Sequence, residues 1–409
     1  MMRATIALVL GLTLLPSFAT GADDTGLPES IAERLEGQIA LGQGGQAFNR
    51  QDYEAAAEHL GRAVKAIPSD GTAWHRLGYS LIVLGRLEEA LHAFEKQLSL
   101  GVLPPVASYN CACSHSRLGN LDEAFRYLNQ AVAFGFNDAN LARSDSDLDA
   151  LRSDERMRSV LERLTKGTAL RGELTGKISA LDWQGALEIA EPLVKIAPYD
   201  GQVLQSYGQA LLGLGRYDES AAVFARQAAT GVQPQIALRG LIYTRAGEES
   251  FDAALAKLKS DPSLWKTGQG VPELDDALNR LRKLELVPQG RSALIERDFE
   301  SAAKIYAELL EIDPEDGMSW LGQGLVRYHE GRFEEAMKCF RKQLDRGNAF
   351  ETGLQWTGRA LVRLGRLEEA VAWLEAARRA GVSGEVLRTD ADLAPLQSHE
   401  AWSKLTAEG

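Results

Sequence analysis

The chain has 409 residues, with 45 Lys and Arg against 57 Asp and Glu, so its formal net charge at pH 7 is −12. That balance argues against a nucleic-acid partner, since nucleic-acid-binding proteins carry a basic patch or stripe, and it disfavours docking to anionic membrane surfaces. A chain of this length normally forms two or three domains, but no Ser/Gly-rich or low-complexity linker interrupts it.

The first residues differ from the rest of the chain. Arg3 precedes an apolar run over residues 6–15, and Pro16 and the small residues of 19–22 follow it. This order is typical of a secretory signal peptide, and about ten apolar residues are too few to span a hydrocarbon core of roughly 30 Å. We expect residues 1–22 to be a cleaved signal peptide, no transmembrane segment after cleavage, and a periplasmic or secreted bacterial protein.

A Pro-x-Asp-Gly motif opens three long stretches of the chain, and a glycine closes each stretch 33 residues after the proline. The three copies begin at Pro68, Pro198 and Pro314. Further landmarks keep the same register in every copy: Gly78, Gly208 and Gly324; Phe94, Phe224 and Phe340; Gln97, Gln227 and Gln343. A self-similar unit of roughly 20 to 50 residues indicates an array of stacked repeats.

Each unit is predicted to be two helices that pack on each other. In the first copy Leu77 and Leu81 lie four residues apart, on one face of a first helix, and Gly78 between them leaves room for a second helix to approach. Ala90 and Phe94 then supply a small and a large side chain from that second helix. The pattern predicts nine pairs, keyed on Ala56, Ala90, Ala124, Ala186, Ser220, a degenerate copy after Gly247, Ala302, Ala336 and Ala370.

These landmarks resemble the tetratricopeptide repeat family. The matching motif is Trp74-x-x-Leu77-Gly78-x-x-Leu81 and Ala90-x-x-x-Phe94. Between the two helices, Gly85 is suited to end the first one as a left-handed cap. The resemblance covers almost the whole chain after the first 22 residues. It implies an all-α fold, a right-handed α-solenoid of about nine helix pairs in three tandem modules, which cover residues 23–166, 167–282 and 283–409.

A second signature closes the first and third modules. It reads Arg143-Ser-Asp145-x-Asp147-Leu148-x-x-Leu151 and Arg388-Thr-Asp390-x-Asp392-Leu393-x-x-Leu396. It is similar to the end-of-group variant that closes bacterial tetratricopeptide arrays. The middle module departs from this pattern, because its offset to the next module is 116 residues (Pro198 to Pro314) against 130 for the first (Pro68 to Pro198). We therefore expect a change of superhelical direction over about residues 248–275. It would act as a hinge between two grooves, as a separate docking surface for Trp265, or as a rigid kink.

The alternating aspartates Asp145, Asp147 and Asp149 admit two interpretations. They resemble the start of a calcium loop, although Ala150 and Arg156 stand where that loop needs Gly and Glu. They also suit the start of a helix, where an Asp side chain accepts backbone N–H groups and faces the positive end of the helix dipole. If the chain were instead an enzyme subunit that depends on a cation, these carboxylates would be its candidates.

The three cysteines are predicted to be buried structural thiols. Cys111 and Cys113 point to nearly opposite sides of one helix, so they cannot form a relaxed disulfide with each other. A metal cluster of Cys111, Cys113 and His115 fails for the same reason, and no second ligand pair follows at a zinc-like spacing. Cys339 lies on a second helix and is expected to be a free thiol.

No catalytic motif is found. None of the six histidines forms a His-Glu-x-x-His pair, and no Gly-x-Ser-x-Gly elbow occurs. The segment from Gly172 to Ile178 superficially resembles a phosphate loop, but it is one residue short between its glycines and lacks the Ser or Thr that holds magnesium. We therefore predict no enzyme activity, no catalytic residue, no cofactor and no bound metal.

The family resemblance implies that the first helices line a concave groove, which is how such solenoids bind their partners. By register, the residues of this groove are His75, Tyr79, Ile82, Tyr109, Cys113, Gln202, Gln205, Gln209, Leu321, Leu325, Tyr328, Gln355, Arg359 and Arg363. The Lys, Asn and Arg clamp of chaperone-tail-binding relatives is absent from the first module. The prediction is a non-catalytic scaffold or adaptor of the bacterial cell envelope that binds a protein or an extended peptide; a self-assembling structural protein is the alternative.

Overall fold

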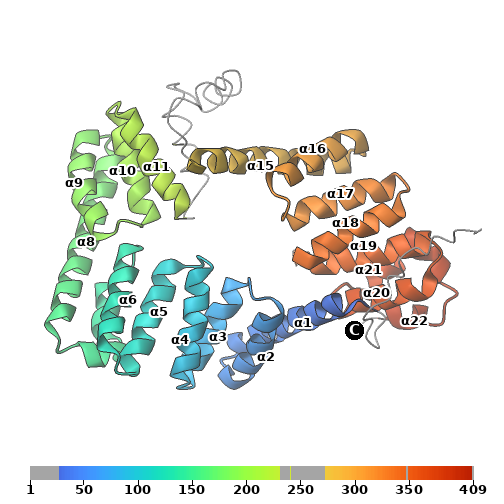
Figure 1. The fold of residues 1–409 in the computed structure, drawn as a ribbon, viewed down its shortest axis with the longest axis horizontal. Helices are drawn as coiled ribbons and strands as arrows, with labels where there is room; N and C mark the ends of the chain where they lie inside the picture. The colour runs from blue at the N-terminus through green and yellow to red at the C-terminus, as the bar shows by residue number, and fades with distance from the viewer. Residues whose placement is uncertain (1–26, 231–239, 241–271, 347–348, 408–409) are drawn as a thin grey trace, which may run out of the picture. The chain divides into compact units, whose positions relative to one another are not determined.

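A computed structural model describes residues 27–230, 240, 272–346 and 349–407 (Figure 1). Residue contacts divide the chain into two compact units, one from Gly37 to Glu315 and one that joins Asp316–Gly409 to the residues up to Glu36. Every element among the described residues is an α-helix or a short 3-10 helix, which confirms the all-α fold. Where described, each helix packs mainly on its neighbours in sequence, as in a solenoid.

Eight of the nine predicted pairs fall within the described residues. In each pair, the Ala or Ser residue by which the sequence pattern identified it lies on the second helix and is fully buried. The pairs are α1 (Glu29–Asn49) with α2 (Tyr53–Ala66), α3 (Gly71–Val83) with α4 (Leu87–Ser99), α5 (Pro104–Arg117) with α6 (Leu121–Ala133), α8 (Glu155–Ser179) with α9 (Trp183–Ile196), α10 (Gly201–Gly213) with α11 (Tyr217–Ala229), α15 (Pro272–Ile295) with α16 (Phe299–Ile312), α17 (Gly317–His329) with α18 (Phe333–Arg346), and α19 (Phe350–Arg363) with α20 (Leu367–Arg379).

The remaining elements close the first and third modules. They are α7 (Ala139–Ser144) and η1 (Ser146–Leu151) before α8, and α21 (Gly384–Arg388), η2 (Ala391–Leu396) and α22 (Trp402–Leu405) at the end of the chain. The predicted signal peptide, the degenerate pair after Gly247 and almost all of the expected hinge at 248–275 lie outside the described residues. None of the helices that the structure describes combines the length and the apolar character needed to cross a membrane.

The repeated glycine and phenylalanine meet as the sequence predicts. A methyl group added at Gly78 would lie 2.6 Å from the ring of Phe94, which is fully buried. The equivalent glycines face their own phenylalanines at less than 3 Å, Gly208 against Phe224 and Gly324 against Phe340. Since real carbon atoms do not approach so closely, only glycine allows the two helices of each of these pairs to pack at this distance.

The Pro-x-Asp-Gly motif starts a first helix. Asp70 is the N-cap of α3, and its side chain accepts a hydrogen bond of 2.8 Å from the backbone N–H of Ala73. Asp200 and Asp316 cap α10 and α17 in the same way, and such caps stabilise a helix by about 1 kcal/mol. At the other end of α3, Gly85 has a φ of +75°, so the predicted left-handed cap is confirmed.

Long helices run through both expected module boundaries. The boundary at residues 166 and 167 falls inside α8, which has 25 residues, and the boundary at 282 and 283 falls inside α15, which has 24. Helix α8 contacts α6 and α7 on one side of the boundary and α9 and α10 on the other. At these two places, successive modules therefore share a helix instead of being joined by a linker.

The first turns of α1 pack on the end of the chain, within the same compact unit. Leu27, Ile31 and Leu35 lie four residues apart and are fully buried. Next to them, an Nη of Arg34 donates a 2.9 Å hydrogen bond to the carbonyl of Leu344 in α18. Glu36 also forms an ion pair with Arg379 of α20. This contact joins segments more than 300 residues apart in sequence.

Candidate functional site

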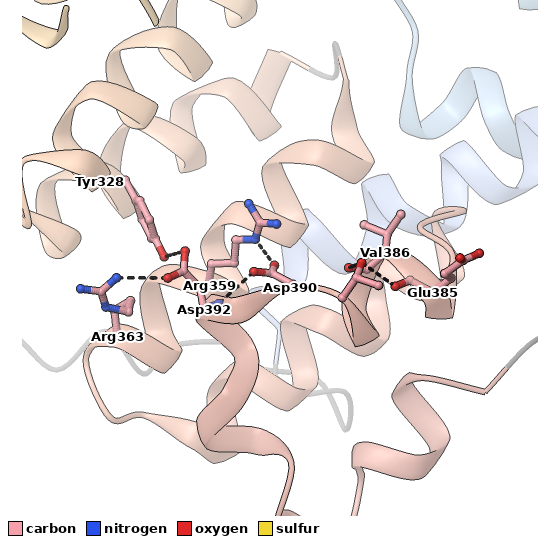
Figure 2. Close-up of polar contacts among 8 residues, drawn as sticks. Tyr328, Arg359, Arg363, Glu385, Val386, Asp390 and Asp392 are labelled. Atoms are coloured by element: carbon pink, nitrogen blue, oxygen red, sulfur yellow. Dashed lines mark hydrogen bonds and ion pairs between the residues drawn. The ribbon is translucent and has the colours of Figure 1, made fainter. Parts of the chain in front are cut away.

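A polar cluster lies where α17, α19 and η2 meet at the end of the third module (Figure 2). Tyr328 of α17 donates its hydroxyl to Asp392 Oδ2 over 2.6 Å, and Arg363 of α19 contacts Asp392 Oδ1 at 3.1 Å. Arg359, one turn before Arg363, forms an ion pair through Nε with Asp390. The remaining oxygen of Asp390 accepts a 3.0 Å hydrogen bond from the backbone N–H of Asp392, which makes Asp390 the N-cap of η2.

Aromatic rings hold this cluster in place. The guanidinium carbon of Arg359 lies 4.2 Å from the ring centroid of Trp356, and Tyr328 meets the same ring edge-on at 5.1 Å. The side chain of Arg359 is only 17% exposed and that of Asp390 only 6%, so their pairing is largely shielded from water. Burial, followed by the hydrogen bond to Asp392, raises the pKa of Tyr328, and this keeps its hydroxyl protonated as a donor.

The first module contains the equivalent cluster. Tyr109 of α5 donates its hydroxyl to Asp145 Oδ2 at 2.8 Å, and the Cys113 sulfur lies 3.8 Å from the same oxygen. Arg117, one turn after Cys113, approaches Asp147 at 3.5 Å. Burial raises the pKa of Asp147 and outweighs the opposite effect of Arg117. In both modules, therefore, the aspartates of the closing signature bind residues of first helices that sequence register assigned to the groove.

The aspartates of the first module serve as helix caps and ion-pair partners. Asp145 is the N-cap of η1, since its Oδ1 accepts from the backbone N–H of Asp147 at 3.0 Å. Asp149 forms an ion pair with Arg152, with 2.7 Å between the charged atoms. The three carboxylates thus face three different partners, and the described residues include no group of three His, Cys, Asp or Glu side chains placed to hold a metal. The geometry supports the helix-start interpretation and gives no support to the calcium loop.

The predicted groove residues divide by burial. Ile82, Leu321 and the two tyrosines of the polar clusters, Tyr109 and Tyr328, are at most 7% exposed and belong to the core, so their side chains cannot form an open binding surface as the register suggested. Arg359 and Arg363 are engaged by the chain's own aspartates. Arg363 is nevertheless exposed, as are Tyr79 and Gln202, whereas Cys113 is buried. The half-buried members are His75, Gln205, Gln209, Leu325 and Gln355.

Tyr79 belongs to an aromatic triad, which we define as Phe48, Tyr53 and Tyr79. Their ring centroids lie 5.6 to 6.0 Å apart in all three combinations, and the guanidinium carbon of Arg76 lies 6.0 Å from the ring centroid of Phe48. Tyr79 is 41% exposed, although it contacts two other aromatic rings. The triad joins the end of α1 and the start of α2 to the middle of α3, and all three helices meet in the unit that begins at Gly37.

Sequence register identified only Tyr79 of this triad. A signal for a second member was nevertheless present, because an aromatic residue follows the helix-capping aspartate at the same place in every module: Asp52-Tyr53, Asp182-Trp183 and Asp298-Phe299. Phe48 shows no such recurrence, and only the packing of α1 on its neighbours places it beside Tyr79.

The three cysteines are free and buried, as predicted. Burial raises the pKa of the Cys111 thiol to about 12 and raises that of Cys113 well above its ordinary value. The pKa of Cys339 is also raised, again mainly by burial. Thiols in such surroundings are poor nucleophiles.

Comparisons with known proteins agree with this architecture. A family model described as tetratricopeptide repeat matches residues 41–99 and 287–349, and a second model of the same description matches residues 356–376.

Among curated proteins, the chain is similar to a chloroplastic protein of Arabidopsis thaliana, with 39% identity over 74 residues, which is 17% of this chain and 22% of that protein. It is also similar to the peroxisomal targeting signal receptor of Saccharomyces cerevisiae, with 29% identity over 111 residues, or 27% of this chain and 18% of the receptor. The chain therefore spans about a fifth of the length of these relatives. Among solved structures, the P58(IPK) TPR domain aligns over 90% of this chain and 96% of its own, with 14% identity and a TM-score of 0.29.

Proposed function

Because the chain is a tetratricopeptide repeat protein, we propose that it is a non-catalytic scaffold that binds a protein or an extended peptide, and that the aromatic triad of α1, α2 and α3 is the centre of its binding surface. The observation that carries this proposal is the exposure of Tyr79 within a cluster of three aromatic rings. Tyrosine is enriched among the residues that dominate binding energy at protein interfaces.

The surroundings of the triad suit a peptide. Val83 lies one turn beyond Tyr79 on α3 and is 50% exposed, so the helix offers an aromatic and an aliphatic side chain on the same face. Arg76, one turn before, adds a cation beside Phe48. Aromatic rings that are already packed against each other lose little conformational freedom when a partner covers them, which favours affinity.

Two considerations support a protein partner over a small molecule. The relatives include one named as a receptor for a targeting signal, although the shared region is 18% of that protein. The polar clusters at Asp145 and at Asp390 use their charged groups within the chain, so they have the geometry of structural caps and not that of a reaction centre.

We also propose that the protein acts in the bacterial cell envelope after export. The charged, apolar and small-residue order of residues 1–22 supports this setting. N-terminal sequencing of the protein recovered from a periplasmic fraction tests it: cleavage near residues 19–22 is expected, and an intact N-terminus in the cytoplasmic fraction would contradict export.

Affinity capture tests the binding proposal. Wild type, Tyr79→Ala and Glu88→Ala proteins are immobilised and exposed to the same envelope extract, and retained proteins are quantified by mass spectrometry. Glu88→Ala is the matched control, because it removes an exposed side chain from the second helix of the same pair. We expect at least one protein to be retained about tenfold less by Tyr79→Ala alone, as the loss of a hot-spot residue costs more than about 1.4 kcal/mol. Equal retention by all three proteins would overturn the proposal.

A further inference from the structure

A cavity of about 590 Å³ opens between α8 and the α7–η1 segment that precedes it. It lies wholly inside the compact unit from Gly37 to Glu315 and does not involve the aromatic triad. Its lining consists of Arg143, Arg152, Met157, Arg158, Leu161, Glu162, Thr165, Lys166 and Ala169. The volume is in the range of roughly 300 to 1,000 Å³ that is usual for ligand sites.

One face of α8 forms the wall of this cavity. Arg158, Leu161, Thr165 and Ala169 follow one another at intervals of three and four residues, the spacing of a single helical stripe. Leu161 is half-buried and provides the apolar floor, whereas Met157 is only 2% exposed and belongs to the core. Arg143 comes from α7, which packs against α8.

Two of the cations in the cavity have no ion-pair partner among the described residues. Arg152 pairs with Asp149 and Arg158 pairs with Glu155, so these charges are compensated within the chain. Arg143 bonds only to the neutral side chain of Asn140, at 3.1 Å, and Lys166 forms no ion pair. Glu162 is the single acidic residue of the lining. In a chain with a net charge of −12, this leaves a local site that is positively charged.

The third module shows which hydrogen bond Arg143 lacks in the first module. Its counterpart in the same signature, Arg388, donates to the carbonyl of Thr406, which becomes available because helix α22 ends at Leu405. The corresponding carbonyl in the first module belongs to Leu161, in the interior of α8, where the helix continues to Ser179. That carbonyl is used inside the helix, and it also accepts a 2.8 Å bond from the Thr165 hydroxyl. Because α8 continues through this position, Arg143 has no free carbonyl to bond there, and its side chain lines the cavity instead.

We propose that this cavity binds an acidic peptide segment, whose carboxylates pair with Arg143 and Lys166 and whose aliphatic side chain covers Leu161. Charge complementarity selects the carboxylates, and the apolar floor selects a peptide over a simple anion. The site is separate from the aromatic triad and does not depend on the function proposed above.

Fluorescence anisotropy tests this site directly. The probe is a fluorescein-labelled peptide of sequence Glu-Glu-Leu-Gly-Glu-Glu-Leu, and the protein variants are Arg143→Gln with Lys166→Gln, and the control Lys65→Gln with Lys96→Gln. The control removes two exposed lysines from α2 and α4 of the same unit. We expect the cavity variant to bind about tenfold more weakly, the control to match wild type, and Glu162→Gln to bind two- to threefold more tightly.

Changes in the probe distinguish the alternatives. A peptide with Ser in place of Leu should bind at least threefold more weakly, because it cannot cover the apolar floor, and added salt should weaken binding of the original peptide. Equal binding of the Leu and Ser peptides, equal binding by the cavity and control variants, or tighter binding of a single-stranded oligonucleotide at the same residues would each overturn the proposal. Circular dichroism of every variant verifies that it is folded.

Discussion

Tyr328 and Asp392 are 64 residues apart in sequence, yet the tyrosine hydroxyl donates to the carboxylate over 2.6 Å. Together with the Arg359–Asp390 ion pair, this bond fastens the closing element η2 to the first helices of two successive pairs. In the first module, Tyr109 and Asp145 fasten η1 to one first helix, α5.

The Arg359–Asp390 pair is expected to stabilise the third module. Asp390→Asn keeps an oxygen for the cap of η2 but removes the charge, and it leaves Arg359 largely buried without its counter-charge. We predict a loss of about 2 to 3 kcal/mol in the free energy of unfolding. A double-mutant cycle with Arg359→Gln measures the coupling, which should be about 1 to 3 kcal/mol. Additive effects of the two substitutions would contradict a direct interaction.

Two glycine substitutions should have opposite effects. Gly78→Ala places a methyl group 2.6 Å from the ring of Phe94 and should cost about 1 to 3 kcal/mol through overpacking. Gly61→Ala is the control, because nothing lies within 4 Å of the added carbon in the interior of α2. It should stabilise the protein by about 0.5 to 1 kcal/mol, since alanine favours a helix over glycine. Urea denaturation followed by circular dichroism measures both, and a neutral Gly78→Ala would contradict the close approach of the helices.

The cysteines should be unreactive in the folded protein. Their raised pKa values keep all three thiols protonated at pH 8, and burial blocks access by reagents. Titration with a disulfide reagent at pH 8 should detect almost no thiol in the native protein and three per chain in guanidinium chloride. Rapid labelling of any cysteine without denaturant would show that it is more accessible than the structure indicates.

Asp147 should oppose folding at neutral pH. Because burial raises its pKa, the ionised form is less favourable in the folded chain than in the unfolded chain, so its unfavourable contribution is present at pH 7 and disappears as the pH falls below its usual range near 3.8. Asp147→Asn should therefore unfold at a higher temperature than wild type at pH 7, and the two should converge at low pH. A lower unfolding temperature at pH 7 would show that the ion pair with Arg117 outweighs burial.

Much of the fold could be predicted from the sequence, because each repeat places the same types of residue at the same spacing. Gly78 and Phe94 must meet in one pair, and the recurrence of both residues at a fixed spacing made that contact predictable. Aspartate at the start of η1 was similarly predictable, since helix caps depend on neighbouring residues alone. Contacts between residues of a single repeat unit could therefore be predicted from the sequence.

The candidate site was less predictable, because it depends on contacts between distant segments. Their positions within the repeat assigned Arg359 and Tyr328 to an open groove. Those positions could not indicate that Asp390 and Asp392 of the closing element contact the same two residues. The packing of Leu27 and its neighbours on the end of the chain has no local signal either. The continuation of α8 past Leu161, which opens the cavity beside Arg143, depends on how two modules join.

Binding of a protein partner over the aromatic triad can be tested by site-specific photo-crosslinking. A photoreactive amino acid replaces Tyr79 in one protein and Glu88 in a second, and both are irradiated with the native envelope extract. We expect a covalent adduct of discrete mass from position 79 and none from position 88. Adducts of equal yield at the two positions, or no adduct at position 79, would contradict it.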